Sequence, residues 1–300
     1  MVAINSSFII NIDFSISYIH ISNMRKNYKL ITKDTEEINI TLYSASEKIS
    51  NNFLFFVHGF KGFKDWGFGP YLGEYFAQNG FTSILFNFSH NGVKGNSIEF
   101  TELDKFSKNT FSREIGELNE LIDAAKHGFF EGIVPDKIGL IGHSRGGAIS
   151  LLTAYQRSDL NSIALWASVS NLDRYSERQK EVWRKKGVFE VLNHRTKQIM
   201  SLGLVLLEDL EKNKNSSLNI KKAINSLKIP IFIGHGEQDL AVKIKEAEEL
   251  YTWSKKETTE FIKISTTGHT FDMVHPHEKT NEKFEYLLSK TLLFFKRNFY

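Results

Sequence analysis

The chain has 300 residues, 41% hydrophobic and 24% charged, which is typical of one globular domain or of one domain carrying an insert. A formal net charge of +3 is too small to indicate nucleic acid as a partner, and the lack of cysteine excludes disulfides, thiolate chemistry and cysteine-based metal sites. No apolar run reaches the ~18 residues of a transmembrane helix, so no integral membrane segment is expected.

The first residues differ in composition from the rest of the chain. Ser, Asn and Ile dominate residues 1–23, and polar residues interrupt the apolar ones, unlike the continuous apolar core of a secretory signal. Met24, followed by the basic Arg25, is a more natural start. We therefore expect residues 1–26 to be an extension that is disordered or not native, and the protein to be cytoplasmic. A divergent signal segment is the alternative.

From residue 27 on, strand and helix patterns alternate along most of the chain. Strands are expected at 28–32, 38–43, 52–57, 82–88, 137–141, 162–168, 230–234 and 260–264. Helices are expected at 71–78, 110–127, 145–156, 243–255 and 280–296. This alternation predicts an α/β fold, with a mostly parallel, doubly wound sheet of about eight strands covered by helices on both faces.

Residues 171–228 interrupt this alternation. Their pattern predicts a helical cap, inserted between core segments 27–170 and 229–300. Helices are expected at 178–185, 188–193, 197–211 and 220–227, with no strand among them. The insert carries 13 Lys and Arg against 7 Asp and Glu. A solvated helix face is the favoured interpretation of this charge, and attraction of an anionic substrate or surface is the alternative.

The stretch GHSRGG, at 142–147, lies between an expected strand and an expected helix. Strand, G-x-S-x-G and helix together form a nucleophile elbow, in which glycines without a Cβ allow a sharp turn that exposes the serine. The pattern predicts Ser144 as a nucleophile. It also places the Arg145 N–H at a helix N-terminus, which favours developing negative charge. A Gly-rich turn without chemistry is the alternative.

A serine nucleophile needs a base, and the base needs an orienting acid. Asp239 follows the strand at 230–234, and His269 follows the strand at 260–264, so both are expected at the sheet edge where ligands bind in α/β proteins. The predicted triad is Ser144, His269 and Asp239. Glu237, on the same turn as Asp239, is the competing acid, and His235 is the competing histidine.

The loop that follows the strand at 52–57 has the sequence HGFKGF. In this arrangement a backbone N–H of the loop completes the oxyanion hole. We expect the N–H groups of Phe60 and Arg145 to form that hole. His58 is expected to hold the loop by hydrogen bonding and to have no catalytic role.

Four aromatic side chains are candidates for substrate binding. Trp66 and Phe68 belong to the loop beyond the strand at 52–57, and loops at that edge commonly carry function. Trp183 and Phe189 belong to the cap, where apolar side chains can line an acyl or aryl pocket. No histidine spacing indicates a metal site, so neither metal nor cofactor is expected.

Several motifs resemble one family when they are taken together. The chain is similar to serine esterases of the α/β-hydrolase superfamily, in the branch of dienelactone-hydrolase-like proteins and cinnamoyl (feruloyl) esterases, over roughly residues 38–297. The stretches that carry the resemblance are HGFKGFKDW (58–66), FNFSHNG (86–92), GHSRGG (142–147), HGEQDLAV (235–242) and GHTF (268–271). At two positions the chain departs from this branch: Arg145 stands where its esterases often have Gln, and Lys243 stands where a proline is common. Dienelactone hydrolases use a cysteine nucleophile, which this chain lacks.

The resemblance implies a serine hydrolase that cleaves carboxylic esters through an acyl-enzyme, with small or aromatic acyl groups favoured. A lysophospholipase or monoacylglycerol lipase-like esterase is one alternative. A prolyl-oligopeptidase-like peptidase is another, although the chain lacks a β-propeller, and a non-catalytic binding protein is the third. The expected partner is a small-molecule ester, and a homodimer is left open.

Overall fold

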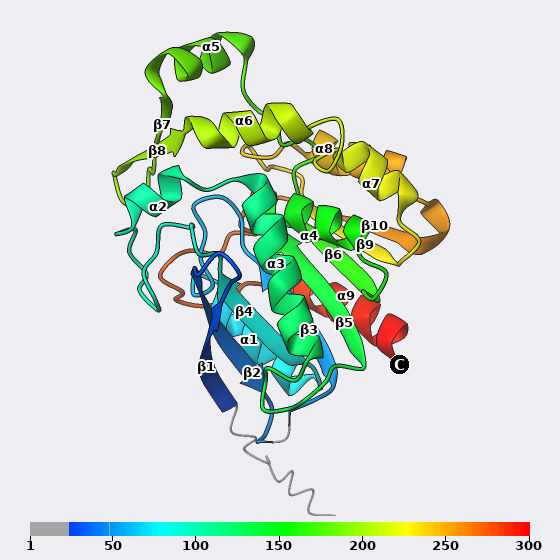
Figure 1. Ribbon diagram of the computed structural model, residues 1–300. Coiled ribbons are helices and arrows are strands. Elements are labelled where there is room, and N and C mark those ends of the chain that lie inside the picture. Colours follow the sequence, from blue (N-terminus) through cyan, green and yellow to red (C-terminus); the bar gives the residue numbers. More distant parts are fainter. Residues whose placement is uncertain (1–23, 48) are drawn as a thin grey trace, which may run out of the picture.

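A mostly parallel sheet forms the centre of the molecule (Figure 1). The computed structural model describes residues 24–47 and 49–300. The strands of the sheet are β1 (Met24–Ile31), β2 (Glu37–Ser44), β3 (Asn52–Val57), β4 (Thr82–Asn87), β5 (Lys137–His143), β6 (Ser162–Trp166), β9 (Ile231–Gly236) and β10 (Thr259–Ile264). They follow the order β1-β2-β4-β3-β5-β6-β9-β10, in which β2 pairs antiparallel with β1 and β4, and the other pairs are parallel. The α/β prediction and the eight strands are confirmed.

Helices cover both faces of this sheet (Figure 1). On one face α4 packs against α3 and α7, and α7 packs against α8, while α1 and α9 contribute to the core on the other face. The helices are α1 (Gly69–Gln78), α2 (Leu103–Ser107), α3 (Phe111–Lys126), α4 (Arg145–Gln156), α5 (Glu177–Lys186), α6 (Leu204–Asn213), α7 (Ile220–Ser226), α8 (Ile244–Trp253) and α9 (Glu282–Phe299), with a 3-10 turn at Lys256–Thr258. The sequence did not predict α2, since five residues are too few to show a helical period.

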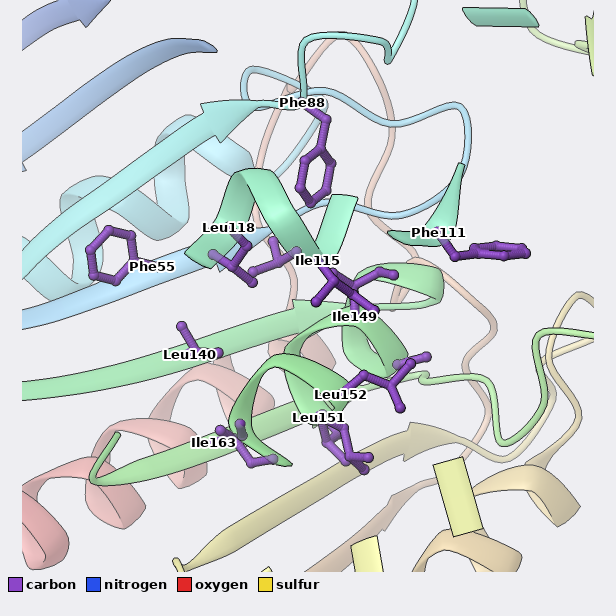
Figure 2. Close-up of a cluster of buried hydrophobic side chains, with 14 of the residues drawn as sticks. Phe55, Phe88, Phe111, Ile115, Leu118, Leu140, Ile149, Leu151, Leu152 and Ile163 are labelled. Atoms are coloured by element: carbon purple, nitrogen blue, oxygen red, sulfur yellow. The ribbon is translucent and has the colours of Figure 1, made fainter. Parts of the chain in front are cut away.

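Strand β3 shows why the sheet is buried on both faces. Its side chains alternate, so Phe53, Phe55 and Val57 join the core under α3 and α4, whereas Leu54 and Phe56 join the core under α1 and α9. A strand covered on both sides is therefore apolar where it is buried, as β3 is from Phe53 to Val57. Figure 2 shows the first of these cores, where side chains of β3, β5 and β6 meet those of α3 and α4.

The predicted extension overlaps the described part of the chain at residues 24–26. These residues belong to β1, which pairs with β2 from Met24 onward. The remainder of the extension, residues 1–23, lies outside the described residues. That translation starts at Met24 stays a prediction.

The insert at 171–228 lies between β6 and β9 and contains a β-hairpin in addition to its helices (Figure 1). The helix predicted at 188–193 is wrong, because this stretch is β7 (Val188–Leu192), paired antiparallel with β8 (Ile199–Gly203). The helix predicted at 197–211 is β8 followed by α6. Gly187, with a φ of 76°, ends α5, and the side chains of β7 then alternate between exposed and half-buried, which is the period of a strand.

Candidate active site

Ser144 stands at the turn between β5 and α4. Its φ of 58° and ψ of −121° lie in a region that non-glycine residues rarely occupy, at a cost of ~1–3 kcal/mol. The turn is stabilised because the Ser144 N–H donates to the carbonyl of Trp166, on the neighbouring β6, at 2.8 Å. Strain of this kind, held by the surrounding structure, is common at catalytic turns.

Glycines allow the backbones around Ser144 to come close together. A Cβ on Gly146 would lie 2.1 Å from the carbonyl oxygen of Val57, and one on Gly142 would lie 2.4 Å from that of Gly146. A Cβ on Gly59 would lie 2.9 Å from the Ser144 Cβ. These close approaches bring β5, α4 and the loop after β3 against one another, with the serine at their junction.

The structure brings together the three side chains that the sequence singled out. Asp239 follows β9 and His269 follows β10, so both lie at the carboxyl ends of their strands. The Ser144 Oγ lies 3.0 Å from His269 Nε2, and His269 Nδ1 lies 2.7 Å from Asp239 Oδ2. If Nδ1–H donates to the carboxylate, Nε2 is left free to accept the serine proton.

The Asp239 carboxylate is buried and fully engaged. Its Oδ1 accepts hydrogen bonds from the N–H groups of Ala241 and Val242, each at 2.8 Å. Burial raises its pKa, but hydrogen bonds from His235 and His269 outweigh burial and hold the pKa well below the usual range of an aspartate. The carboxylate therefore stays ionised, as the orienting acid of a triad must.

Glu237 and His235, the competing acid and histidine, do not take part in the hydrogen-bonded chain from Ser144 to Asp239. Glu237 is exposed and, among the described residues, makes no hydrogen bond or ion pair with His269. His235 is fully buried, and its Nε2–H donates to the Val242 carbonyl at 2.8 Å while lying 3.4 Å from Asp239 Oδ2. His235 thus supports the acid and does not reach Ser144.

Two further histidines next to the serine are neutral. Burial lowers the pKa of His58 to about 4 and that of His143, which also faces His269, to about 3. His58 donates to the Gly59 carbonyl at 3.0 Å and accepts from the Phe88 N–H at 3.3 Å, so it holds the loop in the way expected for it. His143 donates to the carbonyl of His269 at 2.8 Å.

The Phe60 ring lies against the Arg145 side chain beside the serine. The guanidinium is 4.8 Å from the Phe60 ring centroid, and its Nη2 lies 2.6 Å from Oε1 of Glu114, on α3. Burial raises the pKa of Glu114, whereas the Arg145 charge and the Asn109 amide lower it. The sequence pattern did not predict this pair. A charged Glu114 on the helix face of Phe111 and Ile115 was the available signal, because an acid among apolar residues requires a partner.

Two cavities flank the serine. The first, of about 170 Å³ and called cavity 1 here, has walls that include the aromatic side chains of Phe56, Phe60, Phe63, Trp66 and Phe68. The second, of about 380 Å³ and called cavity 2, lies toward Tyr175 and Val242. Ser144 and His269 line both cavities, so an ester bond at the serine could extend one part into each.

The predicted substrate-binding aromatics do not all reach this site. Trp66 and Phe68 line cavity 1, and their role in substrate binding stays a prediction, whereas Trp183 and Phe189 line neither cavity. Trp183 is fully buried within the insert, where its ring centroid lies 5.0 Å from that of Tyr175 and 5.4 Å from that of Phe189. These two residues stabilise the insert behind Tyr175.

Within residues 24–47 and 49–300, no group of three His, Cys, Asp or Glu side chains is placed to hold a metal ion. None of the helices in the same ranges is both long enough and apolar enough to cross a membrane.

Comparison with known proteins identifies the fold. No protein-family model matches the sequence, and no curated protein matches it. Among solved structures, the α/β hydrolase GrgF from Penicillium sp. sh18 is similar at 18% identity and a TM-score of 0.66, over 92% of this chain and 99% of that one. Est1E from Butyrivibrio proteoclasticus with bound ferulic acid is similar at 16% identity and a TM-score of 0.68, over 92% of this chain and 99% of that one. Esterase Pf2001 from Pyrococcus furiosus is similar at 18% identity and a TM-score of 0.63, over 93% of this chain and 92% of that one.

These likenesses, together with the strand order, show that the chain has the α/β-hydrolase fold. The structures similar to it include esterases and other hydrolases.

Proposed function

We propose that this protein is a serine hydrolase that cleaves carboxylic esters through an acyl-enzyme. The observation that carries the proposal is the continuous hydrogen-bonded chain from Ser144 through His269 to the buried Asp239, at a strained turn that opens into two cavities. Fold alone does not define an activity, so the argument rests on this site.

The distances support a two-step reaction. Ser144 Oγ attacks the ester carbonyl carbon while His269 Nε2 takes its proton, and Asp239 stabilises the imidazolium that results. The carbon–oxygen bond to the alcohol then breaks, and the imidazolium gives its proton to the leaving oxygen. Water attacks the acyl-enzyme through the same base, which releases the acid and restores Ser144.

The backbone N–H groups of Phe60 and Arg145 are the proposed oxyanion donors. Arg145 begins α4, so its N–H has no acceptor within the helix. No described residue accepts a hydrogen bond from the Phe60 N–H, and the close approach of Gly59 to Ser144 brings that part of the loop beside the serine. Each such donor contributes ~10²–10³ to turnover.

Small or aromatic acyl esters are the proposed substrates. The size and aromatic walls of cavity 1 favour a compact or planar group over a long acyl chain. The ferulic acid bound to the similar Est1E is an aromatic acid of this kind.

Labelling with a fluorophosphonate probe tests the proposal, with Ser144→Ala as the control. We expect one adduct per chain on the peptide that contains Ser144, none in the variant, and hydrolysis of ester substrates by the unmodified protein. A folded protein that neither reacts nor cleaves esters would refute the proposal in favour of a binding protein. Cleavage of matched amides as fast as esters would identify a peptidase.

A further inference from the structure

Two basic side chains lie at the mouth of cavity 1. Arg195 belongs to the turn between β7 and β8, and Lys61 belongs to the loop after β3. Both line cavity 1 together with Ser144 and His269. The insert and the loop beside the serine thus bring positive charge to the same opening from separate parts of the chain.

Neither charge is balanced by the protein. No acidic side chain lines cavity 1, and among the described residues neither Arg195 nor Lys61 has an ion-pair partner. Lys61 also lines cavity 2, but the two basic residues that line cavity 2 alone are paired, with Arg174 lying 2.7 Å from a Glu246 oxygen and Arg145 lying 2.6 Å from Glu114. Partial burial lowers the pKa of both Arg195 and Lys61, and Arg195 lowers that of Lys61 further. An anion at this opening would relieve both penalties.

Arg195 is positioned although it lacks an acidic partner. Its guanidinium lies 5.7 Å from the ring centroid of Phe63 and 5.8 Å from those of Trp66 and Phe100. Its backbone N–H donates to the buried Asn193 at 3.2 Å. Among described residues, its side chain makes a single hydrogen bond, a long one of 3.4 Å to the Lys61 carbonyl. Most of its N–H donors are therefore free, while aromatic rings hold the group.

We propose that cavity 1 binds the part of the ester substrate that ends in a carboxylate, which Arg195 pairs with and Lys61 attracts. This inference rests on the proposed esterase function and specifies its substrate. A guanidinium presents parallel N–H donors that match the two oxygens of a carboxylate, and the aromatic walls of the small cavity suit the apolar segment between that carboxylate and the ester bond.

The test compares anionic esters with neutral esters of similar shape. One pair varies the acyl part, para-nitrophenyl hemiglutarate against para-nitrophenyl pentanoate, and a second varies the alcohol part, the butanoate ester of γ-hydroxybutyrate against pentyl butanoate. The variant is Arg195→Gln, and the control is Lys197→Gln, which removes an equal charge from the same turn but from a residue that does not line the cavity.

We expect kcat/KM to favour the anionic ester in at least one pair. Arg195→Gln should lower kcat/KM for that ester about tenfold, as expected for a charge-assisted hydrogen bond, and change the neutral ester by less than about twofold. Lys197→Gln should leave the preference in place. No preference in either pair, or an equal loss on both members in Arg195→Gln, would overturn the inference while leaving the esterase function standing. A preference for a phosphonate-ended ester over the hemiglutarate would overturn the assignment of a carboxylate.

A binding measurement separates this inference from the proposed function. Ser144→Ala protein is titrated calorimetrically with monomethyl glutarate, with and without the added Arg195→Gln change. Binding that weakens about tenfold in the Arg195→Gln background supports the anion site even if no ester is cleaved. Equal affinity in both backgrounds, or no binding in either, overturns it.

Discussion

The pair formed by Arg145 and Glu114 links the turn after Ser144 to α3, and its removal has a predictable effect on stability. Glu114 is 1% exposed, and its Oε1 accepts hydrogen bonds from Arg145 at 2.6 Å and from the Asn109 amide at 2.8 Å. The Arg145 guanidinium also contacts the ring of Phe60. Arg145→Met removes the charge and the hydrogen bond but keeps the backbone N–H that we assign to the oxyanion hole.

Removing one partner of a buried ion pair destabilises a protein by ~3–5 kcal/mol, because the other charge stays buried and unpaired. Since the Arg145 side chain is 12% exposed and its buried Nε has no hydrogen-bond partner among the described residues, we expect Arg145→Met to lower the free energy of unfolding by about 3 kcal/mol, the lower end of this range. The double variant Arg145→Met/Glu114→Gln buries no charge, so it should regain about 2 kcal/mol.

The loss in Arg145→Met should depend on pH. Burial raises the pKa of Glu114 and Arg145 opposes it, so loss of Arg145 raises the folded-state pKa further above the unfolded value. A carboxyl with a raised folded-state pKa destabilises the fold progressively as pH rises above its unfolded pKa of ~4.3. The deficit of Arg145→Met should therefore be larger at pH 8 than at pH 5.

Urea unfolding followed by tryptophan fluorescence, for the unmodified protein and the single and double variants, measures these free energies. Two results would refute the reasoning. One is a deficit below about 1 kcal/mol in Arg145→Met, and the other is a double variant no more stable than the single one.

Three further predictions concern other parts of the site and the core beside it. Asp239→Asn should lower kcat by about 10³–10⁴ in an ester assay without unfolding the protein, whereas Glu237→Gln should change it little; the reverse would make Glu237 the acid. Burial raises the pKa of Glu117 from the usual 4.5 to about 7. Ionisation of this carboxyl should therefore lower the free energy of unfolding, measured with urea, by roughly 3 kcal/mol as pH rises from 4.5 to 7. Glu117→Gln should lack this pH dependence. In Gly59→Ala, the new Cβ would displace the loop from Ser144, so kcat should fall about 100-fold at unchanged circular dichroism.

That Ser144, His269 and Asp239 lie close together could be predicted because local chemistry constrains their positions strongly. Gly142 and Gly146 flank the serine since no Cβ fits there, and that requirement is visible in the sequence as GHSRGG. Asp239 and His269 follow apolar runs that read as strands, and carboxyl ends of parallel strands share one edge. Each of these signals is a short motif that follows an apolar run, so its residue types can be recognised without knowledge of tertiary contacts.

The insert could not be predicted in the same way. Strands β7 and β8 have five residues each, too few to distinguish the period of a strand from that of a helix. Their pairing as a hairpin therefore depends on tertiary contacts. Trp183 and Phe189 were expected at the substrate because they are large and apolar in the insert. Their rings face Tyr175, a direction that follows from how α5 and β7 pack and is not encoded in residue type.

Charge shows the limit of sequence composition most clearly. The insert has an excess of Lys and Arg over Asp and Glu, and that excess alone favours a solvated surface over the attraction of an anion. Ion pairing separates the two cases. Arg174 is paired with Glu246, whereas Arg195 lines cavity 1 beside Lys61 and has no ion-pair partner in residues 24–47 and 49–300. Lys61 lies outside the insert, in the loop after β3. A charge that lines the same cavity as Ser144 is a property of the site, and its location can be known only when both segments are placed in space.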